Sequence, residues 1–327
     1  MSPLDLAEVL RQLPPMTDPN LLTPSGHVED TAAYLLDAER VLLFTADYFT
    51  PVVDDPYVFG QIAAANAFSD VYAMGGRPKL ALNLMSFPSR KHRIDEMLQI
   101  LKGGTDKAVE AGCLIVGGHT VDDAEPKYGL AVIGEARVEN LLRKGGAKPG
   151  DRIALTKPLG TGILATAYKS GDLSESEYAP AVDSMASLNA VAAECALESG
   201  LHGATDVTGF GLLGHLLEMC REAEAGAEIR FSALPFFGGV ERQALDQNVP
   251  GGTYANRDLV LPHVDSPPGF QDHHLLMAAD AQTSGGLLLA VPPGAAERFE
   301  EVCRSRSQRF WWIGTFRSAP CRIQIVP

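Results

Sequence analysis

Long apolar runs are missing from this sequence, and so is an excess of basic residues. No uninterrupted apolar stretch approaches the roughly 20 residues that a bilayer-spanning helix needs, so we expect no membrane association. The chain carries 27 Lys and Arg against 41 Asp and Glu, a net charge of −14. Nonspecific nucleic-acid binding depends on basic side chains that neutralise phosphates, so we expect no nucleic-acid partner. The start, MSPLDLAEVLRQLPP, lacks the basic-then-apolar layout of a secretory signal, which predicts a cytoplasmic protein.

Paired cysteines are missing as well. The five cysteines are scattered, with no CxxC pair and no histidine at zinc-ligand spacing, which excludes a disulfide scaffold and offers no reason to predict a zinc site. Each stands among apolar neighbours and is predicted to be a buried, inert thiol: Cys113, Cys195, Cys220, Cys303 and Cys321.

Three common motifs are absent. The sequence has no G-x-x-x-x-G-K-[ST], no G-x-G-x-x-G after a predicted strand and no G-x-S-x-G. The two commonest nucleotide-binding loops and the hydrolase nucleophile elbow are therefore excluded. Any nucleotide site must be of another kind.

What the sequence does have is typical of a two-domain globular protein. Its 327 residues are 46% hydrophobic and 21% charged, and a domain usually takes roughly 100–200 residues. The basic, Gly/Pro-rich run RKGGAKPGD (143–151) predicts a boundary at about residue 150. We therefore expect domains over 1–150 and 151–327.

Apolar periodicity predicts strands and helices in both halves. The polar turn DAER between two apolar runs indicates a hairpin, so the fold class is predicted as α+β with two sheets. Strands are predicted over 31–36, 41–49, 79–87, 113–118 (short and buried), 128–138, 152–158, 287–292, 311–316 and 321–326, and helices over 2–13, 59–75, 90–112, 184–199, 212–223 and 295–305.

The helix over 59–75 presents a polar face. Asn66 and Asp70 lie four positions apart, so they share one side of the helix. Asp70 comes in the last turn before Gly75, where the helix dipole is negative. A carboxylate there is unfavourable unless a cation compensates, which favours a ligand role. A solvated acid at a helix end is an equally good interpretation of this single residue.

Three further acids stand near the ends of predicted elements. Asp30 closes a polar loop, Asp47 ends the apolar run VLLFTAD, and Asp206 lies in the glycine-rich segment GATDVTGFGLLGH. Each alone is equally consistent with a turn residue. If the fold brings these carboxylates together with Asp70, they form the oxygen-rich kind of cluster that holds Mg²⁺ beside substrate phosphates. The sequence leaves both interpretations open.

Two glycine pairs adjoin predicted strands. GGHT (117–120) follows the run CLIV, and QTSGG precedes LLL (287–289). A glycine pair lets a ligand approach the backbone closely, and His119 can donate a hydrogen bond to a phosphate oxygen. Both segments are candidates for contact with an anionic ligand.

Four segments together carry a family resemblance: TADYFTPVVDDPYVFGQIAAANAFSDVYAMGGRP, GGHTVDDAEPKYGLAV, TDVTGFGLLGHLLEM and DAQTSGGLL. Over nearly all of the chain the sequence resembles the selenophosphate synthetase (selenide, water dikinase) family, within the aminoimidazole ribonucleotide synthetase-like superfamily. The resemblance implies a two-domain α+β fold, with an N-terminal sheet that forms a homodimer and a C-terminal α/β domain. It implies synthesis of selenophosphate from selenide, ATP and water, with release of AMP and phosphate, in selenium metabolism and selenocysteine biosynthesis.

The resemblance also implies residue roles. It assigns Mg²⁺ to Asp30, Asp70 and Asp206, and it places Glu29 where the family more often has a second aspartate. Gly117 to Thr120 match a strand end that contacts nucleotide, contributed across the dimer. The implied ATP-binding set is His27, Val28, Glu29, Asp47, Asn66, Asp70, Gly117, Gly118, His119 and Thr120.

The sequence departs from the family at its start. Family members carry a glycine-rich segment with a catalytic Cys or selenocysteine, and a Lys three positions on, just before a helix resembling SPLDLAEVLRQLP. Here that helix begins at Ser2, so these catalytic residues are expected upstream of Met1 and none is assigned within the chain. We therefore expect the printed chain to bind Mg-ATP with low activity. Either an engineered truncation before Met1, or a start assigned at Met1 after a selenocysteine codon, would explain this.

Two alternative functions remain open. One is a nucleotide-binding, non-catalytic dimer, which a restored Gly-Cys-x-x-Lys segment would distinguish. The other is a kinase or synthetase of the same superfamily acting on a different small substrate, which product analysis would distinguish.

Overall fold

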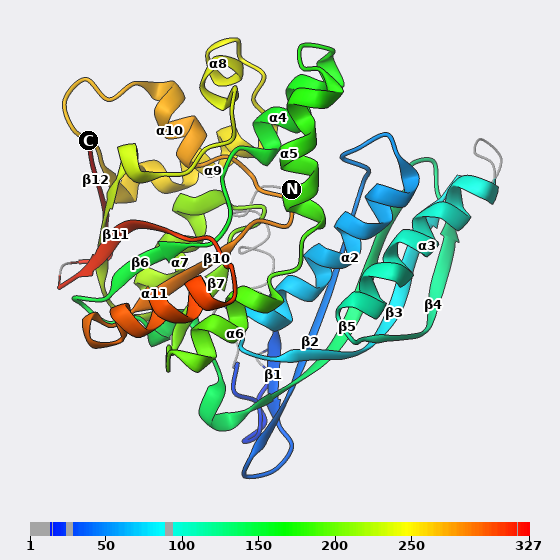
Figure 1. The fold of residues 1–327 in the computed structure, drawn as a ribbon, viewed down its shortest axis with the longest axis horizontal. Coiled ribbons are helices and arrows are strands. Elements are labelled where there is room, and N and C mark those ends of the chain that lie inside the picture. The colour runs from blue at the N-terminus through cyan, green and yellow to red at the C-terminus, as the bar shows by residue number, and fades with distance from the viewer. Residues whose placement is uncertain (1–13, 15, 24–28, 89–93, 319) are drawn as a thin grey trace.

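Two sheets with their covering helices make up the computed structural model, which describes residues 14, 16–23, 29–88, 94–318 and 320–327. The first sheet has five strands in the order β1-β2-β5-β3-β4, and the second has seven in the order β7-β10-β6-β11-β8-β12-β9. In Figure 1 most strands of the first sheet lie at the right and those of the second sheet at the left. The predicted α+β class with two sheets is confirmed.

Three of the sequence predictions fall on residues that the structure does not describe. Met1, the helix predicted over 2–13, and the residues His27 and Val28 all lie outside the described residues. The expectation that the family's Cys and Lys belong upstream of Met1 therefore stays a prediction, as does an ATP-binding role for His27 and Val28.

The five-stranded sheet is covered on one face by two packed helices (Figure 1). The predicted hairpin is confirmed, since β1 pairs antiparallel with β2, while β3 pairs parallel with β4. The elements are β1 (Ala32–Leu35), β2 (Arg40–Phe49), β3 (Arg77–Phe87), β4 (Leu114–Asp122) and β5 (Lys127–Arg137), with the helices α2 (Pro56–Ala73) and α3 (Ile94–Glu110).

Helix α2 is fixed at both ends by local chemistry. Asp55 caps its start by accepting hydrogen bonds from the backbone N–H groups of Tyr57 and Val58, as a short acidic side chain does at a helix N-terminus. The chain leaves the helix through Gly75, whose φ is +73°, and a Cβ there would lie 2.5 Å from the carbonyl oxygen of Asn140. The predicted helix over 59–75 is confirmed, with its first residue three positions earlier.

The strand predicted over 113–118 exists as β4, but the prediction that it is buried is wrong. Strand β4 is an edge strand and most of it is exposed. Leu114 and Val116 are 65% and 59% exposed, and Leu80 and Leu82 of β3 are exposed beside them. Alternate residues of a strand face opposite sides, and the helices cover the side of Ala81 and Met85. We call the other side the outer sheet face: Phe44, Tyr48, Leu80, Leu82, Leu114 and Val116.

The seven-stranded sheet is built entirely from residues after 150. Its strands are β6 (Arg152–Leu155), β7 (Gly203–Asp206), β8 (Gly226–Arg230), β9 (Val264–Asp265), β10 (Leu287–Val291), β11 (Trp311–Arg317) and β12 (Ile323–Val326). The helices that accompany it are α4 (Thr161–Ser170), α5 (Glu175–Ala186), α6 (Ala190–Glu198), α7 (Gly211–Glu222), α8 (Val240–Leu245), α9 (Gly251–Val260), α10 (Asp272–Ala278) and α11 (Ala296–Ser305).

The single helix predicted near 184–199 is two helices. Helix α5 ends at Ala186 and α6 begins at Ala190. Between them the buried side chain of Asn189 donates hydrogen bonds to Ser69 Oγ and to the carbonyl oxygen of Gly285, each at 2.8 Å. Contacts distant in sequence therefore divide a segment whose local pattern is helical.

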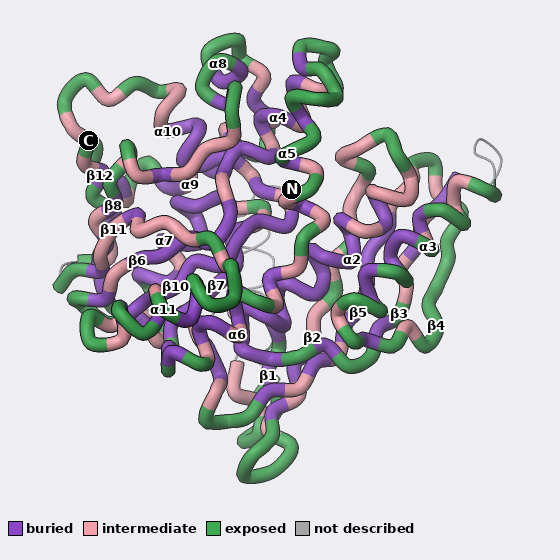
Figure 2. Tube along the Cα trace, viewed as in Figure 1, coloured by how far each residue is buried: buried purple, intermediate pink, exposed green. Residues whose placement is uncertain are grey.

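Strand β10 lies in the core with both faces covered. Leu287 and Leu289 belong to the same hydrophobic cluster as residues of the first sheet and α2, including Leu43 and Phe68, whereas Leu288 belongs to the cluster that contains the buried leucines of α7. Figure 2 shows this continuous buried region running from one half of the molecule into the other. One hydrophobic cluster thus contains residues from both halves, and the division at residue 150 stays a prediction.

Burial of the thiols is confirmed for four of the five cysteines, and Cys321 is half-buried. Among the described residues, no helix is both long and apolar enough to cross a membrane.

Candidate functional site: a buried carboxylate cluster

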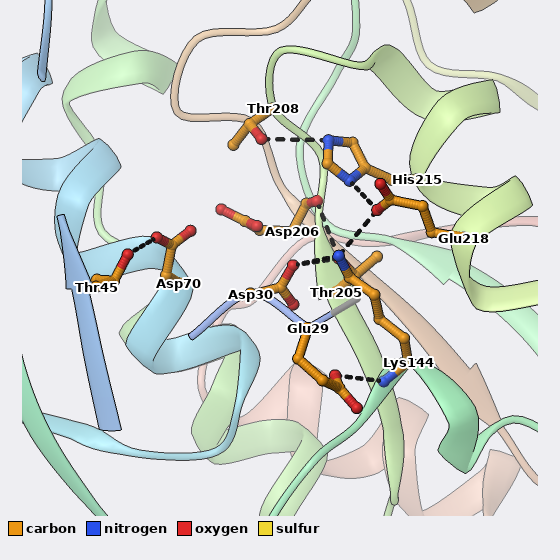
Figure 3. A network of polar contacts seen from close by, with 10 residues as sticks. All are labelled: Glu29, Asp30, Thr45, Asp70, Lys144, Thr205, Asp206, Thr208, His215 and Glu218. Atoms are coloured by element: carbon orange, nitrogen blue, oxygen red, sulfur yellow. Dashed lines mark hydrogen bonds and ion pairs between the residues drawn. The ribbon is translucent and has the colours of Figure 1, made fainter. Parts of the chain in front are cut away.

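The three aspartates expected to bind metal lie together where the two halves meet (Figure 3). Asp30 comes just before β1, Asp70 lies in the last turn of α2, and Asp206 is the last residue of β7. Helix α2 packs against β7, which carries Asp70 to Asp206. Residues far apart in the sequence thus form one carboxylate cluster, which we define as Asp30, Asp70 and Asp206.

Burial and mutual repulsion make these carboxylates hard to ionise together. The pKa of Asp70 is held well above its usual range by burial first, and then by the charges of Asp206, Asp47 and Asp30. Burial, followed by the charge of Asp30, raises the pKa of Asp206 to about 6. Two carboxylates 4 Å apart repel by about 4 kcal/mol at an effective dielectric constant of 20. A cluster of this kind takes up protons or divalent cations.

Each carboxylate of the cluster has one oxygen held by a hydroxyl donor. Thr205 donates to Asp30 Oδ1 at 2.8 Å, Ser69 donates to Asp206, and Thr45 donates to Asp70 Oδ2. The other oxygens of two of them, Asp30 Oδ2 and Asp206 Oδ2, are buried and have no hydrogen-bond partner among the described residues.

Buried acceptors without a partner are rare and call for an explanation. Carboxylate oxygens are the ligands that Mg²⁺ prefers in proteins. The donor set and the two unpartnered oxygens therefore fit a divalent oxygen-seeking cation.

Lys144 is the first of three residues of this site that sequence reasoning missed, and His215 and Glu218 are the others. It lies in the short helix η2 (Lys144–Gly146), is 3% exposed, and places Nζ 2.9 Å from Asp30 Oδ1 and 2.8 Å from Glu218 Oε2. Burial opposes its charge, but Asp30 and Glu218 together raise its pKa. Lys144 therefore fixes Asp30 through Oδ1, whereas the buried Oδ2 has no hydrogen-bond partner among the described residues.

A histidine and a glutamate extend this network on α7 (Figure 3). His215 contacts Glu218 through Nδ1 at 3.1 Å and Thr208 through Nε2 at 3.2 Å. Burial raises the pKa of Glu218, but the hydrogen bond and charge of His215 and the charge of Lys144 bring it down to about 2. The loop after Asp206 is thus tied through Thr208 to the same set of charges.

Glu29 faces the backbone of η2. It accepts a hydrogen bond of 3.1 Å from the backbone N–H of Lys144, and burial raises its pKa to about 7. A role for Glu29 with ATP stays a prediction.

Asp47 lies within β2, two residues before its end, and not at the strand end that the sequence predicts. Asn66 Nδ2 donates to Asp47 Oδ2 at 2.8 Å, and Asn66 Oδ1 accepts from the backbone N–H of Ser284 at 2.9 Å. Ser284 has φ +48°, a conformation that non-glycine residues seldom adopt. Asn66 therefore links the first sheet to the strained loop that precedes β10.

A cleft of about 1120 Å³ opens beside these residues. Its lining includes Asp47 and Asn66 from the first half of the chain, and Thr166, Lys169 and the segment Thr208 to Phe210 from the second half. Sites for small molecules and cofactors typically measure about 300–1,000 Å³. The cleft is large enough for a nucleotide and lies next to the carboxylate cluster.

The four predicted residues of GGHT do not join this cleft within one chain. Gly117 to Thr120 lie on β4, separated from β2 by β5 and β3, which is about 14 Å at ordinary strand spacing. They are exposed along the edge strand. Their predicted contact with nucleotide therefore requires a second copy of the chain.

Comparison with known proteins gives the class. Residues 28–136 match the family model "AIR synthase related protein, N-terminal domain", and residues 148–320 match its C-terminal domain. The fold is similar to the crystal structure of thiamine-monophosphate kinase from Stenotrophomonas maltophilia, with TM-score 0.68, 19% identity and coverage of 98% of this chain and 95% of that one. It is also similar to hydrogenase maturation protein HypE in complex with ATP, with TM-score 0.69, 22% identity and coverage of 94% and 86%. The chain has the AIR synthase related fold.

Sequence relatives narrow the assignment. Selenide, water dikinase of Carboxydothermus hydrogenoformans is 48% identical over 309 residues, which span 94% of this chain and 89% of that protein. Selenide, water dikinase 2 of Peptoclostridium acidaminophilum is 45% identical over 292 residues, spanning 89% and 84%. The chain belongs to the selenide, water dikinase family.

Proposed function

We propose that this protein makes selenophosphate from selenide, ATP and water and releases AMP and phosphate. The observation that carries the proposal is a buried carboxylate cluster beside a nucleotide-sized cleft. Two of its oxygens have no hydrogen-bond partner among the residues that the structure describes, and the chain is 48% identical to a selenide, water dikinase. The likeness to thiamine-monophosphate kinase is at 19% identity and concerns the fold alone, so it does not favour a different kinase activity. The cytoplasm stays the predicted compartment.

Asp30, Asp70 and Asp206 would hold Mg²⁺, and ATP would bind in the neighbouring cleft that Asp47 and Asn66 help to line. Bound Mg²⁺ supplies positive charge that neutralises the phosphates and aligns them for phosphoryl transfer. Lys144 keeps Asp30 oriented, and Ser69 does the same for Asp206. These residues position the ligand oxygens and take no part in bond making.

We also propose a homodimer formed through the outer sheet face. Six large apolar side chains lie there on one side of a sheet whose other side is covered by α2 and α3. Large exposed apolar patches mark interaction surfaces. Such a dimer gives the exposed segment Gly117 to Thr120 a way to contact nucleotide bound to the partner copy.

The test measures products and their dependence on selenide. The chain is assayed as printed and with a glycine-rich Cys- and Lys-bearing segment added ahead of Met1. We expect Mg²⁺-dependent ATP binding by calorimetry in both, and selenophosphate by ³¹P NMR with matching AMP in the extended chain. Asp206→Asn should abolish turnover, whereas Asp183→Asn, an exposed acid of α5, should leave it unchanged. ATP consumption that yields ADP, or that is indifferent to selenide, would contradict the proposal.

A further inference from the structure

A second group of possible metal ligands lies outside the cleft. Glu241 on α8 and the adjacent histidines His273 and His274 on α10 offer three ligand atoms that all lie within 4.8 Å of one another. Helices α8 and α10 pack against each other at the edge of the C-terminal half (Figure 1). None of the three residues lines the cleft, so this group is separate from the carboxylate cluster.

The distances are close to those of a tetrahedral zinc site. Glu241 Oε1 lies 3.4 Å from His274 Nε2 and 3.8 Å from His273 Nε2. Ligands about 2.0–2.1 Å from a tetrahedral zinc ion lie about 3.3–3.4 Å from each other. Movement of a few tenths of an ångström by the exposed Glu241 side chain would bring its 3.8 Å distance to His273 to that value, and the ligand atoms of the two histidines lie within 4.8 Å of each other.

The surroundings orient the imidazoles. The ring of His274 lies 4.7 Å from that of Phe231 and 5.3 Å from that of Phe270, and the two histidine rings are 4.1 Å apart. The histidine side chains are only 19% and 24% exposed. Partners that hold a ligand in one orientation strengthen metal binding because less freedom is lost. The two phenylalanine rings therefore preorganise His274, against which the ring of His273 packs.

The third proposed ligand, Glu241, borders a cavity. Glu241 lines a space of about 480 Å³ together with Phe231 and Phe236. Zinc sites with three protein ligands keep a fourth position for water or a small ligand. The cavity provides room for that fourth ligand beside the carboxylate.

We propose that Glu241, His273 and His274 bind one zinc ion, with water as the fourth ligand. Imidazole nitrogens suit zinc and other late divalent transition metals, whereas Mg²⁺ prefers oxygen ligands only. The site is independent of the proposed function. Its spacing, two adjacent histidines and a glutamate far upstream, matches no zinc motif, which is why the search for zinc-ligand spacing missed it.

Calorimetric titration with zinc chloride tests the site, in excess Mg²⁺ so that the carboxylate cluster is occupied. We expect one zinc equivalent per chain. Glu241→Gln and His273→Asn, which nearly preserve size, should each weaken its affinity at least about tenfold. The control His263→Asn, at a histidine on another helix, should bind zinc as the unchanged chain does, and so should Asp206→Asn.

Binding of Mg-ATP by every variant at unchanged affinity, Asp206→Asn excepted, checks that the fold is intact. Three results would overturn the site. The unchanged chain could bind no zinc equivalent, Glu241→Gln and His273→Asn could bind zinc with the affinity of the unchanged chain, or Asp206→Asn could lose zinc binding. The last would place the zinc at the carboxylate cluster.

Discussion

Lys144 determines how much negative charge the carboxylate cluster can hold without a metal. Its ammonium group is buried and contacts carboxylates from two separate segments, Asp30 and Glu218. A buried charge that loses its partner destabilises the folded state by several kcal/mol. The free energy of unfolding should therefore depend strongly on this one amine.

We expect Lys144→Met to lower the free energy of unfolding by about 3–5 kcal/mol, the usual effect of breaking a buried ion pair. Urea unfolding in the absence of Mg²⁺ measures it. Mg²⁺ should recover part of the loss, because it neutralises Asp30 in place of the amine. Lys148→Met is the matched control, since Lys148 is exposed in the same segment, and it should change stability little. Equal stability of the two variants would contradict this role for Lys144.

At the residue scale, the sequence predicts some residues of the site and not others. Asp30, Asp70 and Asp206 are selected because an acid at a helix end or a turn is chemically conspicuous, although the resemblance was needed to group them. Lys144 stands in a run whose composition indicates a connector, and its partner Asp30 is distant in the sequence. Nothing local shows that contact, because it exists only once η2 packs on α7 and β7.

At the scale of elements, the two faces of the first sheet have different roles. On β2, Thr45 and Asp47 face α2 and contact Asp70 and Asn66, whereas Phe44 and Tyr48 belong to the outer sheet face. One strand thus serves the candidate site on one side and the proposed dimer on the other. A change on the outer side should alter assembly without changing the carboxylate cluster of the same chain.

Leu82→Asp should convert the proposed dimer to a monomer, because it places a charge in the middle of the outer sheet face, where Leu82 is 45% exposed. Sedimentation velocity measures the change. The control is Leu98→Asp on α3, a leucine that is 58% exposed outside this face and should leave the dimer intact. A dimer that survives Leu82→Asp, or that Leu98→Asp dissociates, would place the interface elsewhere.

The alternation of Leu80, Leu82 and Leu84 with Ala81 and Met85 predicts strand β3 correctly, but it does not say which side is covered. Here the smaller Ala81 and the flexible Met85 are buried beneath the helices and two of the leucines are exposed. An apolar pattern indicates that one side of a strand is suited to burial. Whether a helix or another chain covers it is decided by tertiary and quaternary packing.

At the scale of the whole molecule, the carboxylate cluster joins the two halves, because Asp70 comes from α2 and Asp206 from β7. The ordinary pKa of an aspartate is about 3.9, and that of Asp206 is raised to about 6. A carboxyl group whose pKa is raised by folding stabilises the folded state below its unfolded pKa. That contribution is lost as the pH rises through the folded value.

In the presence of a chelator, Asp206 should therefore lower the free energy of unfolding by about 2–3 kcal/mol between pH 4 and pH 6.5. Burial gives Asp70 a shift in the same direction. Other groups titrate in the same range, including Asp280 with its pKa raised by burial to about 7. We therefore compare the unchanged chain with Asp206→Asn by urea unfolding across this range, since their difference isolates the cluster.

Mg²⁺ should reverse this loss of stability at neutral pH, because a cation that binds only the folded state stabilises it. The gain is about 2.7 kcal/mol at a Mg²⁺ concentration one hundred times the dissociation constant. Asp206→Asn should be the more stable chain without metal at pH 7 and should gain little from Mg²⁺, whereas Asp183→Asn should follow the unchanged chain throughout. A difference between the unchanged chain and Asp206→Asn that stays constant with pH and with Mg²⁺ would mean that the carboxylates at the junction neither repel one another nor share a cation.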